Sequence, residues 1–451
     1  MFSKVLIANR GEAAVRVIRA CRDLGIRTVA VYSEADATCL HVRIADEAVC
    51  IGPAATGRSY LNVPHIVQGA LMTGAEAIHP GTGFLSESAA FAEICTGYGL
   101  NFIGPLPETI WQLGDKARAR TVMRDAGLPV MPGSDAPVRS LDDAKALAES
   151  LGYPVMLKAV NGGGGKGIRK LQSAQELVAA FPVAQAEATS AFGNPDIYLE
   201  KCIEDARHVE VQILGDRHGA IVHLGERDCS LQRRAQKVIE EAPASGLPVE
   251  VRDQLCAAAV AGARAANYVN AGTWEFLVDR DDNFYFMEAN TRLQVEHPVT
   301  EAVTGIDMVR MQLEVASGGH LPWTQDQITI RGHAIECRVT ADDPLRNFAP
   351  DAGVVSRFDI PGGPGIRVDT HVVAGYEVPP FYDSLLAKVI SFGADREEAR
   401  VRMIRALAEY RIEGLATTVP FHQRLLSDAA FIAQATTTTF VERWLPTADW
   451  S

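Results

Sequence analysis

The sequence lacks any apolar run that approaches the roughly 20 residues needed to span a bilayer. It also lacks the pattern of a signal peptide, because Arg10, Glu12 and Arg16 interrupt the apolar residues at the N-terminus. Basic residues are outnumbered by acidic ones, 43 to 56, and the formal net charge is −13. General binders of nucleic acids or anionic membranes need clustered lysine and arginine, so both classes are disfavoured. We expect a cytoplasmic protein with no nucleic-acid or membrane partner.

Cysteine is scarce and dispersed. The 451 residues contain eight cysteines, with no CxxC pair and no Cys/His cluster. This spacing disfavours a zinc site, and reduced thiols are expected. Two nucleotide-binding signatures are missing as well. The turn Asn9-Arg10-Gly11-Glu12 lacks GxGxxG spacing, and the glycine-rich loop at 162–167 does not match GxxxxGK[ST], so a nicotinamide site and a Walker-type loop are poorly supported.

The composition that is present is that of a globular protein, with 47% hydrophobic and 22% charged residues. A length of 451 residues predicts two or three domains. The chain begins with an apolar strand at Lys4–Ala8, a helix with Val15, Ile18 and Leu24 inward, and a strand at Thr28–Tyr32. This pattern predicts a βαβ unit on a mostly parallel sheet, and therefore an α/β fold that is α+β overall.

Further along the chain, short apolar runs separated by turn residues predict strands and hairpins. Gly215-Asp216 and Asp279–Asn283 are the turns of two predicted hairpins. A helix is expected over about 396–412. The expected strands are Tyr153–Ala159, Ile168–Lys170, Tyr198–Lys201, Val209–Leu214, Ala220–Leu224, Thr273–Val278, Phe284–Glu288, Ala334–Val339 and Leu385–Phe392.

The segment Met287–Glu301 carries polar residues at alternate positions in the sequence MEANTRLQVEHPVTE. In a strand, or an extended segment that continues one, alternate side chains project to one face. A strand that only meets water would favour Thr, Ser and Lys there. The residues on this face predict instead a site for metal ions and small anions; they are Glu288, Asn290, Arg292, Gln294 and Glu296.

Two acids, Glu275 and Glu288, lie on the two arms of one predicted hairpin. Their side chains are expected to meet across it, and adjacent like charges destabilise a hairpin without a counterion. Together with Asn290 they form an all-oxygen ligand set, which suits magnesium bridging nucleotide phosphates. The alternative is a pair of acids balanced by surface lysines.

The glycine-rich loop Gly162–Gly167 follows Lys158, which ends a predicted strand. Its unshielded backbone amides can bind phosphate oxygens, and Lys158 can add an ammonium group. Glycines alone are also typical of a mobile surface turn. The nearby lysine favours the phosphate interpretation.

A third charged segment, Glu226–Ala244, has no simple amphipathic pattern. A solvated loop is the usual structure of such a segment. Alternatively, it lines a pocket for an anion through Gln232, Arg233, Arg234 and Lys237.

Taken together, these motifs resemble those of the biotin carboxylase family, within the ATP-grasp superfamily. The resemblance follows the order of the motifs over nearly the whole chain, which makes it specific. The motifs are IANRGEAAVRVIRA at the start, HPGTGFLSE at His79–Glu87, GDK at Gly114–Lys116, GGGGKG, EK at Glu200-Lys201, RHVEVQ, ERDCSLQRRAQK, MEANTRLQVEHPVTE, GHAIECRV and PPFYDSLLAKVI.

The resemblance implies three domains. They are an N-terminal βαβ domain at 1–114, an ATP-grasp domain at 115–330 with a mobile glycine-rich lid at about 131–203, and a C-terminal biotin carboxylase domain at 331–445. It also implies the reaction. ATP, bicarbonate and Mg²⁺ (or Mn²⁺) are used to carboxylate biotin on a separate carrier protein.

Residue roles follow from the matching motif positions. ATP contacts are expected at Lys116, Lys158, Gly164, Gly165, Glu200, Lys201, Ile203, His208, Gln232, Glu275 and Glu288. The metal ligands are expected to be Glu275, Glu288 and Asn290. The bicarbonate and biotin site is expected to comprise Lys237, Arg292, Gln294, Val295, Glu296 and Arg338.

Four of these residues are expected to be catalytic: Lys237, Arg292, Glu296 and Arg338. In the family mechanism bicarbonate attacks the γ-phosphate to give carboxyphosphate, with Glu296 as the candidate base. Magnesium, Lys158 and Lys237 offset the phosphoryl charge. Carboxyphosphate then gives CO2 and phosphate, the phosphate deprotonates biotin N1, and Arg338 stabilises the enolate oxygen.

The sequence departs from the family pattern at three positions. Thr82 stands where the family usually has Tyr, Ala235 replaces a common His or Asn, and Cys202 replaces an aromatic residue. The last two fall near the expected nucleotide pocket. They predict altered nucleotide affinity and inhibitor response rather than altered chemistry.

The chain contains no carboxyltransferase domain and no Met-Lys-Met segment of a biotin carrier. A biotin carboxyl carrier protein and carboxyltransferase subunits are therefore expected as separate partners of a homodimer, most simply in an acetyl-CoA carboxylase of fatty acid synthesis. A pyruvate, 2-oxoglutarate or other acyl-CoA carboxylase is the alternative. Two further hypotheses are an ATP-grasp ligase that joins a carboxylate to an amine, and a degenerate scaffold paralogue.

Overall fold

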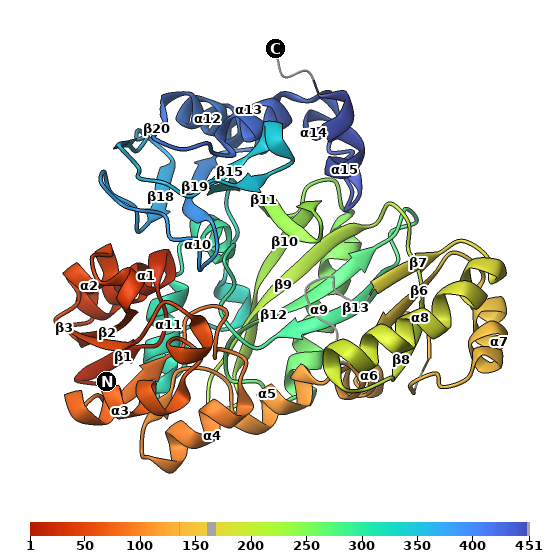
Figure 1. Cartoon of the computed structure of the whole chain (residues 1–451), viewed down its shortest axis with the longest axis horizontal. Helices are drawn as coiled ribbons and strands as arrows, with labels where there is room; N and C mark the ends of the chain where they lie inside the picture. The colour runs from red at the N-terminus through yellow and green to blue at the C-terminus, as the bar shows by residue number, and fades with distance from the viewer. Residues whose placement is uncertain (135, 160–167, 449–451) are drawn as a thin grey trace.

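The computed structural model describes residues 1–134, 136–159 and 168–448 (Figure 1). The predicted loop at 162–167, with the ATP contacts expected at Gly164 and Gly165, lies outside the described residues. Among the helices that are described, none is both long and apolar enough to cross a membrane.

The first sheet has five parallel strands in the order β3-β2-β1-β4-β5, which confirms the predicted βαβ unit. Val5 and Ile7 of β1 pack toward α1 and α11, whereas Leu6 packs toward α3 and α4 on the other face. Such a strand is apolar throughout because helices cover both faces of a parallel sheet. The elements are β1 (Lys4–Ile7), α1 (Gly11–Asp23), β2 (Arg27–Ser33), α2 (Leu40–Ile44), β3 (Glu47–Gly52), α3 (Val63–Thr73), β4 (Ala77–His79), α4 (Ala89–Gly97), β5 (Asn101–Phe102) and α5 (Pro107–Gly114).

A small separate layer follows α6 (Lys116–Asp125) and is seen in yellow at the right of Figure 1. Its three antiparallel strands, in the order β7-β6-β8, have a hydrophobic core of their own with α7 and α8. The elements are α7 (Leu141–Leu151), β6 (Val155–Ala159), β7 (Ile168–Leu171), α8 (Ala174–Phe192) and β8 (Ile197–Lys201). This layer coincides with the segment predicted as a lid, and its movement stays a prediction.

The largest sheet has eight antiparallel strands in the order β13-β12-β9-β10-β11-β14-β19-β18. It crosses the domain border predicted at 330, because β11 pairs with β14 through Ala242 and Ala334. The second and third predicted domains therefore share one sheet. Its strands are β9 (Arg207–Gly215), β10 (Ile221–Arg233), β11 (Gln236–Ala242), β12 (Asn270–Val278), β13 (Phe284–Asn290), β14 (His333–Thr340), β18 (Ile366–Thr370) and β19 (Leu385–Gly393).

Helices and short strands complete the molecule around this sheet. They are α9 (Val249–Ala265), α10 (His297–Thr304), α11 (Met308–Ala316), β15 (Asp342–Asp343), β16 (Ala349–Pro350), β17 (Arg357–Asp359), α12 (Arg396–Glu409), β20 (Arg411–Glu413), α13 (Val419–Ser427), α14 (Ala429–Ile432) and α15 (Phe440–Trp444). The helix predicted over 396–412 ends earlier, at Glu409. The reason is that Tyr410 is extended and Arg411–Glu413 pair with β17.

The charged segment Glu226–Ala244 is not a solvated loop; that expectation is wrong. It forms the end of β10 and all of β11, two inner strands of the large sheet. Arg234 and Ala235 join them in a two-residue turn with φ of 51° and 62°, the conformation that matches the twist of a hairpin. Six of its charged side chains are paired with other side chains, whereas Arg234 at the turn is exposed; the six are Glu226, Arg227, Asp228, Lys237, Glu240 and Glu241.

The extended row predicted over Met287–Glu301 is correct only in its first part. Strand β13 ends at Asn290, a loop follows, and α10 begins at His297. Glu296 becomes the residue that precedes the helix, with φ −81° and ψ 6°. Arg292, Gln294 and Glu296 therefore reach their partners from a loop rather than from one face of a strand.

Candidate active site

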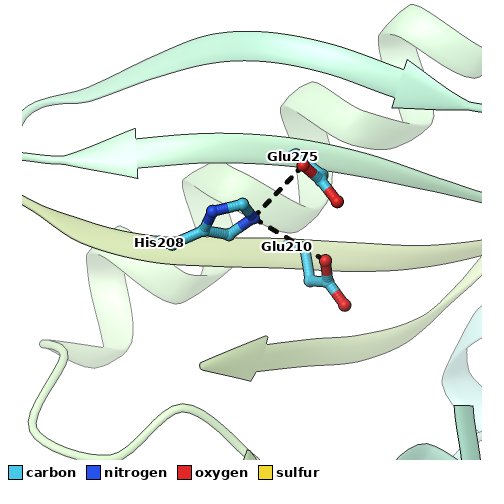
Figure 2. A group of neighbouring side chains, drawn as sticks. All are labelled: His208, Glu210 and Glu275. Atoms are coloured by element: carbon cyan, nitrogen blue, oxygen red, sulfur yellow. Dashed lines mark ion pairs between the residues drawn. The ribbon is translucent and has the colours of Figure 1, made fainter. Parts of the chain in front are cut away.

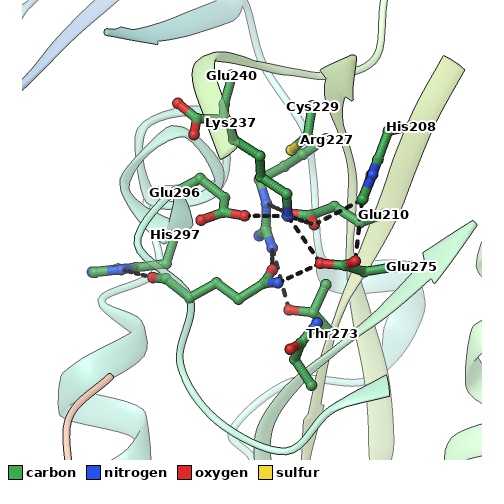
Figure 3. A network of polar contacts seen from close by, with 12 residues as sticks. His208, Glu210, Arg227, Cys229, Lys237, Glu240, Thr273, Glu275, Glu296 and His297 are labelled. Carbon is green, nitrogen blue, oxygen red and sulfur yellow. Dashed lines mark hydrogen bonds and ion pairs between the residues drawn. The ribbon is translucent and has the colours of Figure 1, made fainter. Parts of the chain in front are cut away.

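Lys237 lies at the centre of a cluster of buried charged side chains (Figure 3). Its Nζ donates to Glu210 at 2.6 Å, to Glu275 at 2.9 Å and to Glu296 at 2.6 Å. Burial works to lower the pKa of Lys237, but the three carboxylates outweigh it and raise that pKa well above its usual range. The charged lysine thus brings together residues from β9, β11, β12 and the loop before α10.

Glu296 is held between two cations. Its second carboxylate oxygen accepts from Arg338 Nη2 at 2.9 Å, and Arg338 Nε donates to Glu240 at 2.5 Å. Burial works to raise the pKa of Glu296, but Lys237 and Arg338 outweigh it and hold that pKa below its usual range. Glu296 is therefore ionised. Its pKa, and with it its strength as a base, would rise if Lys237 and Arg338 bound another anion instead.

The two predicted metal ligands Glu275 and Glu288 lie directly opposite each other on β12 and β13. Glu288 is half-exposed and has one described cationic neighbour, Lys116 at 3.6 Å. The negative charge of Glu288 is thus only weakly offset by a nearby cation. Two facing carboxylates of this kind fit a divalent cation of the magnesium type. Asn290 fits less well as a third ligand, because its Oδ1 already accepts from Arg292 Nη2 at 3.0 Å.

A second group of possible ligands, His208, Glu210 and Glu275, lies on the neighbouring strands β9 and β12 (Figure 2). His208 Nε2 is 3.3 Å from Glu275 and 3.8 Å from Glu210, and one ligand atom of each lies within 4.8 Å of the others. Glu210 is already neutralised by Lys237 and Arg227. The all-oxygen pair Glu275 and Glu288 therefore fits magnesium better than this group does.

Arg227 holds two residues at the lysine cluster, Glu210 and Gln294, through hydrogen bonds. The sequence analysis did not identify it. It is fully buried, and it donates to Glu210 at 2.6 Å, Gln212 at 2.7 Å and Gln294 at 2.8 Å. Gln294 in turn donates to Glu275 at 2.7 Å. The Arg227 acceptors Glu210 and Gln212 were missed as well. Their alternation in the strand sequence VEVQ was the available signal, because it indicates a polar face of that strand.

Arg292 faces the first domain rather than the lysine cluster. It donates from Nε to Glu87 at 3.0 Å, and the backbone amide of Thr291 donates to the same carboxylate at 3.1 Å. The predicted motif His79–Glu87 thus contacts the predicted anion site. Val295 is half-buried, and its carbonyl accepts from Lys388 Nζ at 3.0 Å.

The predicted ATP contacts fall into two groups. Lys158 and Arg120 both bind Glu200 of β8, and Gln232 of β10 contacts His208 of β9 at 3.0 Å. The Lys201 ammonium instead donates to the carbonyls of Gly152 and Tyr153, at 2.8 and 3.3 Å. Lys201 has its ammonium engaged inside the lid, and Ile203 beside it is half-buried.

The three departures from the family pattern lie apart from the lysine cluster. Cys202 is buried beside Lys201, and Ala235 is exposed at the tip of the β10–β11 turn. The carbonyl of Thr82 accepts from the Asn9 side chain at 2.7 Å. None of the three contacts Lys237, Glu275, Glu288 or Glu296 through a hydrogen bond within the described chain.

Behind Arg338, Glu240 and Glu336 lie directly opposite each other on β11 and β14, and both are fully buried. Three of their four carboxylate oxygens have no hydrogen-bond partner among the described residues. Burial raises the pKa of Glu240 to about 7 and raises that of Glu336 well above its usual range. The folded protein therefore retains protons on this pair that the unfolded chain releases.

This pair predicts a stability that falls as the pH rises from about 4.5 to about 7, because only the folded state holds the protons. Glu336→Gln should remove the excess acid and raise the free energy of unfolding at pH 8 by about 2 kcal/mol. The gain should be small at pH 5. Urea denaturation at both pH values measures it, with Glu93→Gln at an exposed position of α4 as control. Equal shifts at pH 5 and pH 8 would contradict the interpretation that the folded pair retains protons.

Comparison with known proteins first defines the class. Residues 115–324 match the family model described as "Carbamoyl-phosphate synthase L chain, ATP binding domain", an ATP-grasp ligase domain. Residues 1–110 match "Biotin carboxylase, N-terminal domain" and residues 336–443 match "Biotin carboxylase C-terminal domain".

Individual relatives narrow the class to one family. The "Biotin carboxylase" of Nostoc sp. is 53% identical over 441 residues, which cover 98% of this chain and 99% of that protein. The crystal structure of the biotin carboxylase subunit of pyruvate carboxylase is 49% identical, with 100% of both chains covered and a TM-score of 0.87. The crystal structure of the Hydrogenobacter thermophilus 2-oxoglutarate carboxylase biotin carboxylase domain dimer, with MgADP, ADP and bicarbonate, is 48% identical, with 100% and 99% covered and a TM-score of 0.96. The chain belongs to the biotin carboxylase family.

Proposed function

We propose that this protein carboxylates biotin on a separate carrier protein with ATP and bicarbonate, through carboxyphosphate, as the first half-reaction of a multi-subunit carboxylase. One observation carries the proposal. A single ammonium, Lys237, contacts Glu275 from the metal pair and Glu296, the candidate base, and Glu296 contacts Arg338. A cation site, a base and a guanidinium thereby lie within one continuous set of contacts.

The proposed residue roles follow from these contacts. Glu275 and Glu288 would hold Mg²⁺, which neutralises charge on nucleotide phosphates. Lys237 would bind bicarbonate and the transferring phosphoryl group, and it gives up carboxylate partners to do so. Arg292 would bind the same anion with Gln294 and Val295.

Glu296 acts as the base in this proposal. In the free protein Lys237 and Arg338 depress its pKa. When bicarbonate draws these cations toward itself, the pKa of Glu296 rises and proton removal from bicarbonate becomes easier. Arg338 is then available to the enolate oxygen of biotin, where a planar and permanently charged guanidinium is well suited.

Partners belong to the proposal as well. A biotin carboxyl carrier protein and carboxyltransferase subunits are proposed as separate chains, because two similar proteins are named as subunits of pyruvate carboxylase. A homodimer is proposed because the Hydrogenobacter domain is described as a dimer. Eight free cysteines support the reducing cytoplasm as the compartment.

The final carboxyl acceptor is proposed to be acetyl-CoA, with pyruvate and 2-oxoglutarate as alternatives, because carboxylases named for the latter two compounds include similar domains. This chain does not bind the acceptor in any of these reactions. Reconstitution with candidate carrier and transferase subunits over a panel of acceptors separates them.

The test of the proposed function is ADP release by the purified protein. We expect release that depends on bicarbonate and magnesium and rises on addition of free biotin. Release that depends on an amine and ignores bicarbonate would favour another ATP-grasp ligase. Nucleotide binding with no biotin-dependent turnover would favour the scaffold hypothesis.

A further inference from the structure

The loop that joins β13 to α10 has two backbone amides without a hydrogen-bond partner among the described residues. The N–H groups of Val295 and Glu296 make no hydrogen bond within the described chain, although both neighbouring carbonyls do. Buried backbone donors are almost always paired, so two open amides beside Lys237 and Arg338 are available to a ligand. The side chains of the same loop face the cluster, since Gln294 contacts Glu275 and Glu296 contacts Lys237.

The carbonyls of this loop are held on its buried side. The Gln294 carbonyl accepts from His297 Nδ1 at 2.7 Å, and the Val295 carbonyl accepts from Lys388 Nζ at 3.0 Å. His297 is labelled in Figure 3. Both side chains are almost completely buried, at 2% exposure for His297 and 0% for Lys388.

The two carbonyl contacts determine the direction of the Val295 and Glu296 N–H groups through the geometry of the peptide bonds. The cis peptides of the described chain both precede proline, so the Gln294–Val295 and Val295–Glu296 peptides are trans. In a planar trans peptide the N–H points opposite to the C=O. The Val295 amide is therefore directed away from His297, and the Glu296 amide away from Lys388.

The chemistry of both side chains suits this task. A carbonyl only accepts, so His297 must carry its proton on Nδ1, and burial together with the nearby charge of Lys388 keeps the ring neutral by lowering its pKa. Lys388 is charged, and its Nζ is also 3.0 Å from Glu12 Oε2 of α1. Lys388 of β19 thus connects the first domain, the loop and the last domain.

We infer that Lys388 and His297 are positioning residues, which fix two carbonyls of the loop so that the Val295 and Glu296 amides point at the bicarbonate. This inference rests on the proposed function. It extends the anion site to two residues that do not touch the anion, one of them from the C-terminal part of the chain.

The simpler alternative is that Lys388 is only a buried ion pair that joins α1 to β19. Two variants distinguish the positioning role of Lys388 from a purely structural ion pair, because one removes only Glu12 and the other removes Lys388 as well. Glu12→Gln weakens the ion pair and keeps the ammonium on the Val295 carbonyl. Glu12→Gln combined with Lys388→Met removes that ammonium and leaves no buried Glu12 charge uncompensated.

The experiment measures bicarbonate-dependent ADP release by the full-length chain, with KM for bicarbonate and for ATP. We expect Glu12→Gln to resemble the unmodified protein. The double variant should raise KM for bicarbonate by roughly tenfold or more, the effect of one lost hydrogen bond to a charged group, with KM for ATP changed by less than about twofold. A double variant with an unchanged KM for bicarbonate overturns the inference.

A second pair of variants decides the matter if the double variant does not fold, as judged by circular dichroism and size-exclusion chromatography. His297→Asn keeps a donor near the position of Nδ1, whereas His297→Leu removes it. We expect a higher KM for bicarbonate in His297→Leu than in His297→Asn, and equal values overturn the inference. Absence of any bicarbonate dependence in the unmodified protein would instead refute the proposed function itself.

Discussion

Glu288→Lys is expected to abolish magnesium-dependent ATP cleavage, with a loss of at least roughly 100-fold in turnover. Glu288 faces Glu275 across the β12–β13 hairpin and is the less compensated member of the pair. A lysine there replaces a proposed metal ligand with a charge that would repel the metal, and Lys116 already lies on that side. ADP release measured over a magnesium titration tests this result.

The matched control is Asp281→Lys, the same charge reversal at the exposed turn of the same hairpin. It changes the net charge equally and leaves both opposed carboxylates in place. We expect it to keep nearly full turnover. Unchanged turnover in Glu288→Lys would refute the metal assignment, and equal losses in both variants would indicate damage to the hairpin.

The hairpin that carries Glu275 and Glu288 could be predicted from the sequence because it depends on local rules, and its binding of a metal stays a prediction. Alternating strands around Asp279–Asn283 define a hairpin, and its register follows from the turn as far as the pair Phe276 and Phe286. Beyond that pair a β-bulge shifts the register by one residue and places Glu275 opposite Glu288, and the sequence did not predict this bulge. The same rules predicted the βαβ unit of the first sheet. In each case the elements that meet are close in the sequence, so hydrophobic periodicity and turn residues predict that they pair, but not the bulge that sets the final register.

The lysine cluster could not be predicted in this way. Glu210, Lys237 and Glu296 come from β9, β11 and a loop, and their meeting depends on the strand order of an eight-stranded sheet. Burial of Arg227 likewise depends on which face of β10 is covered. The charged segment around it was therefore compatible with a solvated loop, since composition does not reveal that its charges are paired.

The prediction of one extended polar face over Met287–Glu301 is wrong beyond Asn290, for a related reason. Alternation continues through Glu296 in the sequence, but the chain leaves the sheet after Asn290 and α10 begins at His297. Arg292 consequently binds Glu87 of the first domain. Only the three-dimensional structure reveals this contact between distant motifs.

Arg338→Ala is expected to damage biotin carboxylation far more than bicarbonate-dependent ATP cleavage. Arg338 donates to Glu240 and Glu296 and lies at the edge of the cluster, away from Glu275 and Glu288. Its loss removes one of two cations from Glu296 and leaves Lys237 in place. ATP cleavage without biotin should therefore fall by about tenfold or less.

The biotin-dependent reaction should fall by roughly 10²–10³-fold, the typical effect of removing an oxyanion donor. Arg396→Ala is the matched control, because Arg396 forms a comparable buried pair with Glu241, the residue next to Glu240, at 2.7 and 2.9 Å. We expect that variant to be less stable but to keep the ratio of the two activities. If Arg338→Ala instead reduces both reactions equally, its guanidinium serves only to hold Glu296, and the enolate must be stabilised elsewhere.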